Sequence, residues 1–182
     1  MTFDKKYAEY LSYFNESFDS YLNSLSTVPN NLLDAIKYSA NAGGKRIRPV
    51  LLFLANDTLG GKKEEVLPFA IAIECIHTYS LIHDDLPAID NDDFRRGQLS
   101  NHKKFGEAMA ILAGDSLLNL AYETVLNLPT FSTKHAKSLK LLAEYAGVGG
   151  MIKGQILDLF GGEDLNNIDG ISQILLNKTA KL

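Results

Sequence analysis

Acidic and basic side chains crowd one short stretch of the sequence, HTYSLIHDDLPAIDNDDFRRG at residues 77–97. Aspartates this close together repel one another, so the arrangement is costly unless a cation lies among them. Mg²⁺ is the natural cation, because it binds through one or two carboxylates and completes its shell with water and phosphate oxygens. Arginines that follow at once suit the same phosphate. The residues concerned are Asp84, Asp85, Asp90, Asp92, Asp93, Arg95 and Arg96.

Helix geometry selects two of these aspartates. Seven residues fall only about 20° short of two helical turns, so His77 and Asp84 share one face of a helix. Pro87 disfavours helical geometry at the residue before it, so the helix should end or kink near Asp85. A turn at Pro87 can then bring Asp90 back to the ion that Asp84 binds. We therefore predict that Asp84 and Asp90 are metal ligands.

The acidic run has two other interpretations. A solvated polar loop is the usual form of such a run when it stands alone. A calcium-binding loop requires oxygen donors at alternate positions and glycine at the sixth. Counted from Asp90, the fifth position is Phe94 and the sixth is Arg95, so the calcium template fails.

A second basic segment, AGGKRIRPV, occupies residues 42–50. Pro49 is a good first residue for a helix that continues through Leu59. The segment thus places Lys45, Arg46 and Arg48 at a helix N-terminus, where the helix dipole is already positive. Cations at that end make sense if an external anion also binds the free backbone N–H groups. A solvated basic turn is the alternative.

Composition excludes several classes of protein. The chain has 182 residues, is 46% hydrophobic and carries a net charge of −4, which indicates one globular domain and argues against nucleic acid as a partner. Cys75 is the only cysteine, so no disulfide forms within the chain and a reducing compartment is expected. We find no signal peptide and no apolar run near the roughly 20 residues of a membrane span. The protein should be cytoplasmic and not inserted in a membrane.

Apolar residues recur at helical spacing along the whole chain, so we predict an all-α fold without strands. The segment 64–85 is apolar on most faces and should be the central helix. Residues 102–104 are expected to form a solvated loop. Four glycines around residues 147–154 indicate close helix packing or a lined cavity. Ser132 or Thr133 is expected to cap a helix that runs to about Ala146. The other predicted helices are 2–26, 32–41, 49–59, 64–85, 105–127, a segment around 147–160, and one from about 170 to Thr179.

The segment HDDLPAIDNDDFRRG resembles the first aspartate-rich motif of the trans-prenyltransferases (polyprenyl diphosphate synthases), in the DDxxxxD form typical of bacterial farnesyl diphosphate synthases. The GGKRIRP segment and the helix with Gln155 and Asp158 are similar to the same family. The resemblance implies an isoprenoid-synthase-type helical bundle around a central cavity, and a homodimer. It also implies Mg²⁺-dependent head-to-tail condensation of isopentenyl diphosphate with an allylic diphosphate, dimethylallyl or geranyl, to give farnesyl diphosphate in isoprenoid biosynthesis.

Carried over position by position, the resemblance assigns roles to individual residues. Tyr79, with the two-residue insertion in the motif, limits the product to fifteen carbons. Gln155 and Asp158 are pocket residues of second rank or structural, and no side chain stands out as a dedicated catalytic acid or base. The isopentenyl diphosphate ligands are Lys45, Arg48, His77 and Arg96; the allylic diphosphate ligands are Arg95, Lys178 and Thr179.

The family's second aspartate-rich motif is missing from residues 1–182. We therefore expect a single prenyltransferase domain that is incomplete at its C-terminus, binds diphosphate weakly and turns over poorly. Rival interpretations are a geranylgeranyl or longer-chain synthase, a noncatalytic partner subunit of such an enzyme, and a plain diphosphate- or metal-binding module. A terpene cyclase also uses an aspartate-rich helix, but it has no need of GGKRIRP.

Overall fold

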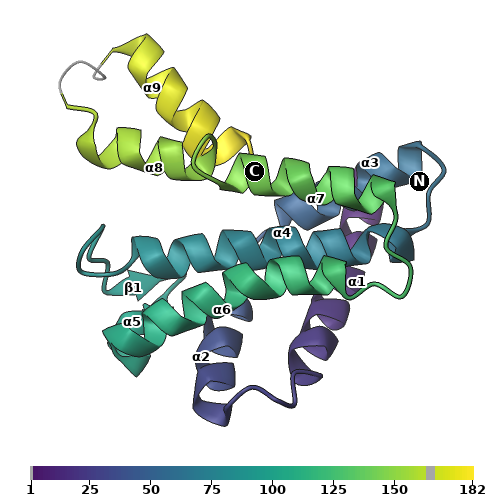
Figure 1. Cartoon of the computed structure of the whole chain (residues 1–182), viewed down its shortest axis with the longest axis horizontal. Helices are drawn as coiled ribbons and strands as arrows, with labels where there is room; N and C mark the ends of the chain where they lie inside the picture. Colours follow the sequence, from purple (N-terminus) through teal and green to yellow (C-terminus); the bar gives the residue numbers. More distant parts are fainter. Residues whose placement is uncertain (1, 163–166) are drawn as a thin grey trace. The chain divides into compact units, whose positions relative to one another are not determined.

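The structure is a computed structural model that describes residues 2–162 and 167–182. It is built from helices with one short hairpin, which confirms the all-α prediction (Figure 1). The chain divides into two compact units, Met1–Asn127 (unit 1) and Leu128–Leu182 (unit 2). The single domain predicted for residues 1–182 stays a prediction.

Unit 1 is organised around α4 (Lys63–Asp84), as the sequence predicts for a central helix. α4 packs along α6 (Glu107–Leu126) and against α3 (Ile47–Thr58) (Figure 1). Ala113 and Ala121 of α6 are fully buried, and side chains this small let the two helices approach closely. The remaining helices of the unit are α1 (Phe3–Asn23), α2 (Asn30–Ala40) and α5 (Asn101–Phe105).

α1 contributes an aromatic face to this core. Phe14 and Phe18 are buried, and their rings stack with centroids 5.3 Å apart. Phe53 of α3 meets the same face, where its ring stacks on Tyr10 at 5.4 Å. The apolar spacing in residues 2–26 therefore serves packing between helices.

α4 departs from one expectation, because it is long and apolar enough to cross a membrane by those criteria alone. Half of its apolar window is buried inside the protein, and Glu74 in the middle of the helix is buried and ion-paired. A central helix covered by its neighbours needs the same composition. The apolarity of α4 is thus accounted for by the core of unit 1.

The prediction of no strands is wrong in one place. β1 (Phe94–Arg95) pairs antiparallel with β2 (Gln98–Leu99). Arg96 and Gly97 form the turn with φ of +53° and +81°, the positive values that a tight hairpin turn needs. Two-residue strands are too short to give an alternating pattern, and arginine is an uncommon first residue for this turn. The sequence therefore carries little signal for the hairpin.

Residues 102–104 lie within α5 instead of forming the predicted loop. His102 is only 5% exposed, and its Nδ1 lies 3.0 Å from the Ser100 hydroxyl oxygen. Because Asn101 also bonds back to the Ala35 carbonyl at 2.8 Å, the segment is held against α2. Asn101 and His102 are thus buried inside the protein, whereas Lys103 and Lys104 stay exposed. Asn101 Oδ1 and His102 Nε2 have no hydrogen-bond partner among the described residues.

α3 begins at Ile47, two residues before the predicted start at Pro49. Proline is tolerated there because the first N–H groups of a helix have no partner within the helix. Arg46 caps the helix in the left-handed conformation, with φ of +46°. Arg48 consequently lies in the first turn of α3, while Lys45 precedes it.

Unit 2 contains α7 (Thr133–Ala146), α8 (Met151–Phe160), α9 (Ile168–Leu175) and the π-helical turn η2 (Leu176–Ala180). Ser132 caps α7 and forms a capping box with His135, which confirms the predicted start. A Cβ on Gly154 of α8 would lie 2.1 Å from the backbone nitrogen of Lys178, so only glycine fits. The close packing predicted from the glycines is confirmed at this position.

Candidate functional site

Four predicted ligands of unit 1 converge on one pocket of about 290 Å³. Lys45 comes from the loop before α3, Arg48 from the first turn of α3, His77 from α4, and Arg96 from the turn of the hairpin. Glu74 is the one carboxylate in its lining. We call this the basic pocket. It brings together three stretches of sequence that lie far apart in the chain.

Arg46 fixes the loop that carries Lys45. Its guanidinium is buried, and its Nη1 donates to the Glu74 carboxylate at 2.5 Å while Nη2 donates to the Ala40 carbonyl at 2.5 Å. Nε donates to Asn15 Oδ1 at 3.2 Å. These partners lie on α4, α2 and α1. Arg46 therefore ties the loop to three helices, a structural part that the sequence analysis did not assign.

The pocket has a strongly positive field. Burial, and then the nearby Arg48 and Arg96, lower the pKa of His77 to about 3, so its imidazole is neutral near pH 7. Burial also lowers the pKa of Arg48 and that of Arg96. A bound anion would relieve this repulsion, and a diphosphate has the charge and the oxygens to do so.

Gly44 is required for the position of Arg96. Arg96 Nη1 donates to the Gly43 carbonyl, and a Cβ on Gly44 would lie 2.7 Å from the Arg96 guanidinium carbon. The backbone of Gly44 also has a positive φ of +128°, which other residues rarely adopt. The GG pair thus lets a hairpin arginine lie directly on the loop.

The acidic turn at residues 84–93 follows α4. α4 ends at Asp84, as predicted from Pro87, and the Asp90 N–H donates to the Asp84 carbonyl at 2.9 Å. The Asn91 N–H donates to the Leu86 carbonyl at 3.1 Å, and Asn91 takes a positive φ of +53°. The chain therefore turns back and brings the two predicted metal ligands next to each other in the backbone.

A magnesium ion fits the donors of this turn. Among the described residues no group of three or more histidine, cysteine, aspartate or glutamate side chains is gathered as a metal site. Mg²⁺ does not need one, since it is held by one or two carboxylates together with water and substrate phosphates. Asp90 is exposed and Asp84 is partly exposed, so both can reach such an ion.

Arg95 lies beside a different carboxylate. Its Nε donates to Asp85 Oδ1 at 2.9 Å, and its Nη2 lies 3.5 Å from Asp92 Oδ2. Burial raises the pKa of Asp85 against the opposing effect of Arg95, while the bond to Asp85 raises the pKa of Arg95. Asp85, which the sequence left without a role, is thus the partner of a predicted phosphate ligand.

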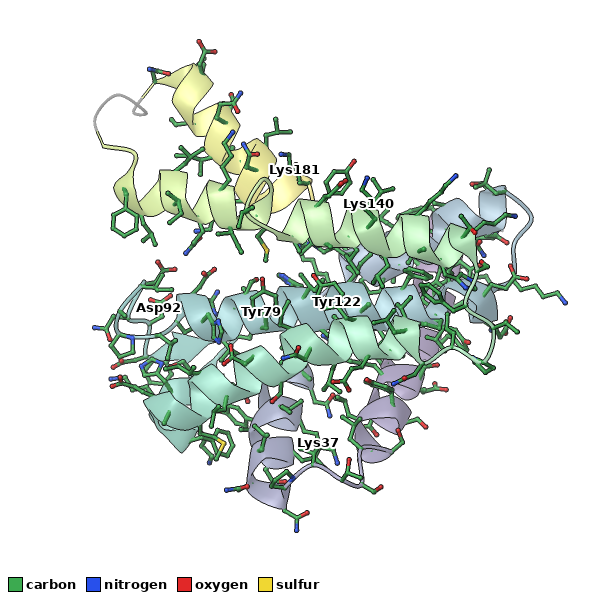
Figure 2. All side chains as sticks on the ribbon, viewed as in Figure 1. Lys37, Tyr79, Asp92, Tyr122, Lys140 and Lys181 are labelled. Atoms are coloured by element: carbon green, nitrogen blue, oxygen red, sulfur yellow. The ribbon has the colours of Figure 1, made fainter. Side chains whose placement is uncertain are left out.

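Tyr79 lies one turn of α4 before His83 and is only 8% exposed. Burial raises its pKa to about 12. Figure 2 labels it on α4, with Tyr122 on the neighbouring α6. Its ring meets the imidazole of His83 edge-on at 5.7 Å.

The position of His83 depends on a glycine. A Cβ on Gly114 of α6 would lie 2.1 Å from His83 Nε2, so glycine leaves the space for that ring. His83 Nε2 lies 3.1 Å from the Ile111 carbonyl oxygen and 3.9 Å from Asp115 Oδ1. The sequence analysis did not single out His83.

Unit 2 brings two of its predicted residues together. Lys178 Nζ on η2 donates to Asp158 Oδ2 on α8 at 2.5 Å. Gln155 lies one turn before Asp158, and its buried Nε2 has no hydrogen-bond partner among the described residues. Thr179 follows Lys178 in the π-helical turn. Neither the turn nor the Lys178–Asp158 pair was predicted.

Comparisons with known proteins agree with these motifs. The polyprenyl synthetase family matches residues 29–182. Farnesyl diphosphate synthase of Micrococcus luteus is 47% identical over 174 residues, 96% of this chain and 59% of that protein. Geranylgeranyl pyrophosphate synthase 7 of Arabidopsis thaliana is 44% identical over 172 residues, 92% of this chain and 49% of that protein.

The fold is also that of solved relatives. The crystal structure of a geranyltransferase from Legionella pneumophila matches 98% of this chain with a TM-score of 0.92 at 37% identity. That match covers 64% of the Legionella chain, so this chain spans about half to two thirds of the relatives it resembles. With the family matched over most of its length, the chain belongs to the polyprenyl synthetase family.

Proposed function

We propose that this protein condenses isopentenyl diphosphate head to tail with dimethylallyl or geranyl diphosphate and yields farnesyl diphosphate. The observation that carries the proposal is the layout of α4, which has His77 in the basic pocket and Asp84 at the acidic turn. Seven residues separate them, about 10 Å along the helix axis and on the same face. Two diphosphates, one on each site, can therefore bind with their hydrocarbon chains near each other.

Isopentenyl diphosphate is assigned to the basic pocket. Lys45, Arg48 and Arg96 supply cationic donors for its oxygens, and His77 supplies a neutral ring nitrogen. Arg46 is committed to its buried ion pair with Glu74, so it is not counted among the donors to the ligand. The pocket positions the nucleophilic double bond and needs no metal for that purpose.

The allylic diphosphate is assigned to the acidic turn. Asp84 and Asp90 would hold Mg²⁺, which when bound stabilises the negative charge that develops on the leaving diphosphate. Arg95 would donate to the same oxygens, and we assign Lys178 and Thr179 of unit 2 to them as well. The allylic C–O bond breaks with its electron pair going to diphosphate, the double bond of isopentenyl diphosphate attacks the cation, and loss of a proton restores neutrality on carbon. Water has to be kept from the cation, because it would quench it.

The product length is assigned from Tyr79. A buried, bulky ring one turn and more before Asp84 would stop a growing chain at fifteen carbons. A geranylgeranyl or longer-chain product is the second candidate, because geranylgeranyl pyrophosphate synthases are 43–44% identical to this chain, close to the 40–48% of the farnesyl diphosphate synthases. Mass spectrometry of the product decides between them.

We also propose a cytoplasmic homodimer, as the resemblance to prenyltransferases implies. The single buried thiol of Cys75 suits a reducing compartment. Light scattering on the purified protein measures the assembly. A monomer that transfers no prenyl group would instead favour the noncatalytic or simple binding alternatives.

The deciding experiment replaces both proposed metal ligands. Asp84→Ala combined with Asp90→Ala should reduce Mg²⁺-dependent binding of an unreactive thio-analogue of dimethylallyl diphosphate by about a hundredfold or more, and should abolish any prenyl transfer. Asp93→Ala is the matched control, since Asp93 belongs to the same turn but pairs with Lys103 at 2.8 Å. Undiminished binding and elongation in the double variant would end the proposal.

A further inference from the structure

The side chain of Asp85 points in a different direction from that of its neighbour Asp84, and it has different surroundings. Consecutive helical residues point about 100° apart, and the Asp85 side chain is only 3% exposed at the end of α4. It lines a small cavity together with Tyr38, Arg95 and Asn101. Its surroundings are thus the hairpin, α2 and α5, and not the open acidic turn.

Both oxygens of the Asp85 carboxylate are used by one guanidinium. Arg95 Nε donates to Oδ1 at 2.9 Å and to Oδ2 at 3.2 Å, and Nη2 also donates to Oδ1. Fork-like contacts of this kind are stronger and more directional than a single charge pair. Arg95 is held at the same time by the pairing of β1 with β2.

The space around Asp85 is too small for a hydrated metal ion. The cavity has a volume of about 20 Å³. A single water needs about 10–15 Å³ on this measure, so the cavity holds about one. Mg²⁺ usually keeps several waters, and it would also have to displace the Arg95 guanidinium.

One edge of the Arg95 guanidinium makes no hydrogen bond within the described structure. The hydrogen bonds of the described structure use its Nε and Nη2, which leaves Nη1 for another acceptor. The side chain is 33% exposed, so Nη1 is within reach of a ligand. A guanidinium fixed along one edge loses little freedom when the other edge binds phosphate.

We propose that Asp85 is a positioning residue that holds Arg95 for the allylic diphosphate and is not itself a metal ligand. The two adjacent aspartates of the motif then have separate tasks: Asp84 serves the metal and Asp85 serves the arginine. This assignment rests on the proposed function, because it takes the diphosphate as the ligand of Arg95.

The test uses Asp85→Asn, Arg95→Gln and the double variant that combines these two changes. Asp84→Asn is the reference for loss of a metal ligand, and Asp93→Asn is the control from the same turn. Calorimetry follows Mg²⁺ alone and then inorganic pyrophosphate in the presence of Mg²⁺. Asp85→Asn should leave the affinity for Mg²⁺ within about twofold and weaken pyrophosphate about tenfold, as Arg95→Gln does. The double variant should bind no more weakly than Arg95→Gln, and Asp93→Asn should bind like wild type.

The outcomes separate the two proposals. Loss of Mg²⁺ binding in Asp85→Asn as large as in Asp84→Asn would make Asp85 a metal ligand and overturn the inference, as would unchanged pyrophosphate affinity. A wild-type protein that binds neither Mg²⁺ nor pyrophosphate refutes the proposed function and the positioning role with it. Unfolding midpoints of the single and double variants check the ion pair itself: additive effects would show that Asp85 and Arg95 are not coupled.

Discussion

The ion pair of unit 1, Arg46–Glu74, and that of unit 2, Lys178–Asp158, illustrate two ways of holding a cation. The side chains of the first are 4% and 2% exposed, and those of the second are 27% and 42% exposed. Arg46 is bonded to residues of three helices, whereas Lys178 meets a neighbouring element of its own unit. The first cation is fixed permanently, while the second can exchange its carboxylate for a ligand.

The difference teaches how much of each proposed site is formed in advance. In unit 1 a buried pair shapes the loop, and the cations proposed to bind the ligand are other residues of the pocket, Lys45, Arg48 and Arg96. In unit 2 the cation of the pair is itself the proposed ligand. We therefore expect changes to the buried pair of unit 1 to affect folding first and changes to the exposed pair of unit 2 to affect ligand binding first.

The largest effect should come from Glu74→Gln. It leaves the Arg46 charge buried without its partner, which costs about 3–5 kcal/mol of unfolding free energy. Urea unfolding measures the loss, with Asp158→Asn as the control of the exposed pair. Equal losses in the two variants would break the comparison.

A change of pH should have an intermediate effect on the unfolding free energy, through His77. The folded pKa of His77 is about 3 and its unfolded pKa is near 6.5, so the unfolded chain binds the extra proton between these values. The stability that His77 contributes is therefore complete above pH 6.5 and is lost as pH falls toward 3, by about 1–2 kcal/mol between pH 7 and 5. Unfolding of His77→Gln should show a correspondingly weaker loss over this range. An identical pH dependence in both proteins would contradict the lowered pKa of His77.

Substitutions of Gly43 and Gly44, in the loop before α3, should differ by a smaller effect, on pyrophosphate binding. Gly43 and Gly44 both have positive φ, but a Cβ on Gly43 meets nothing within 4 Å, while one on Gly44 meets Arg96. Gly44→Ala should weaken pyrophosphate binding about tenfold, and Gly43→Ala should weaken it much less at a similar cost in stability, about 1 kcal/mol. Isothermal titration distinguishes them. Equal affinities would mean that Arg96 does not act from its place on Gly44.

The smallest effect should come from Asp158→Asn. Exposed pairs contribute about 0–1 kcal/mol, so unfolding should change little. Releasing Lys178 from Asp158 should tighten binding of the allylic thio-analogue by a few fold, as fluorescence competition would measure. A loss of more than about 2 kcal/mol in stability would place this pair in the same class as Arg46–Glu74.

The sequence allowed the prediction of features that depend on local rules. Pro87 fixes the end of α4 near Asp84, and Ser132 caps α7 because its hydroxyl accepts a backbone N–H. The motifs also identified Lys45 and His77, which the fold gathers in one pocket. These features follow from helix geometry and from the chemistry of each residue type.

Features that depend on distant partners could not be predicted. Nothing near Arg46 in the sequence indicates that it pairs with Glu74, 28 positions away. His102 is polar and follows the hairpin, so only its burial against other elements explains why it is not in a solvated loop. Likewise the role of Gly44 becomes clear only when Arg96 lies on it. In each case the tertiary contact, and not the local pattern, decides the structure.

Because Cys75 is buried, the reactivity of its thiol can report local unfolding of α4. The thiol is fully enclosed in α4, next to Glu74 and two residues before His77, and burial raises its pKa. It should therefore resist alkylating reagents in the folded state and react only when α4 is released. Labelling rates followed by intact mass would measure how often this helix opens, and how far a bound diphosphate keeps it shut.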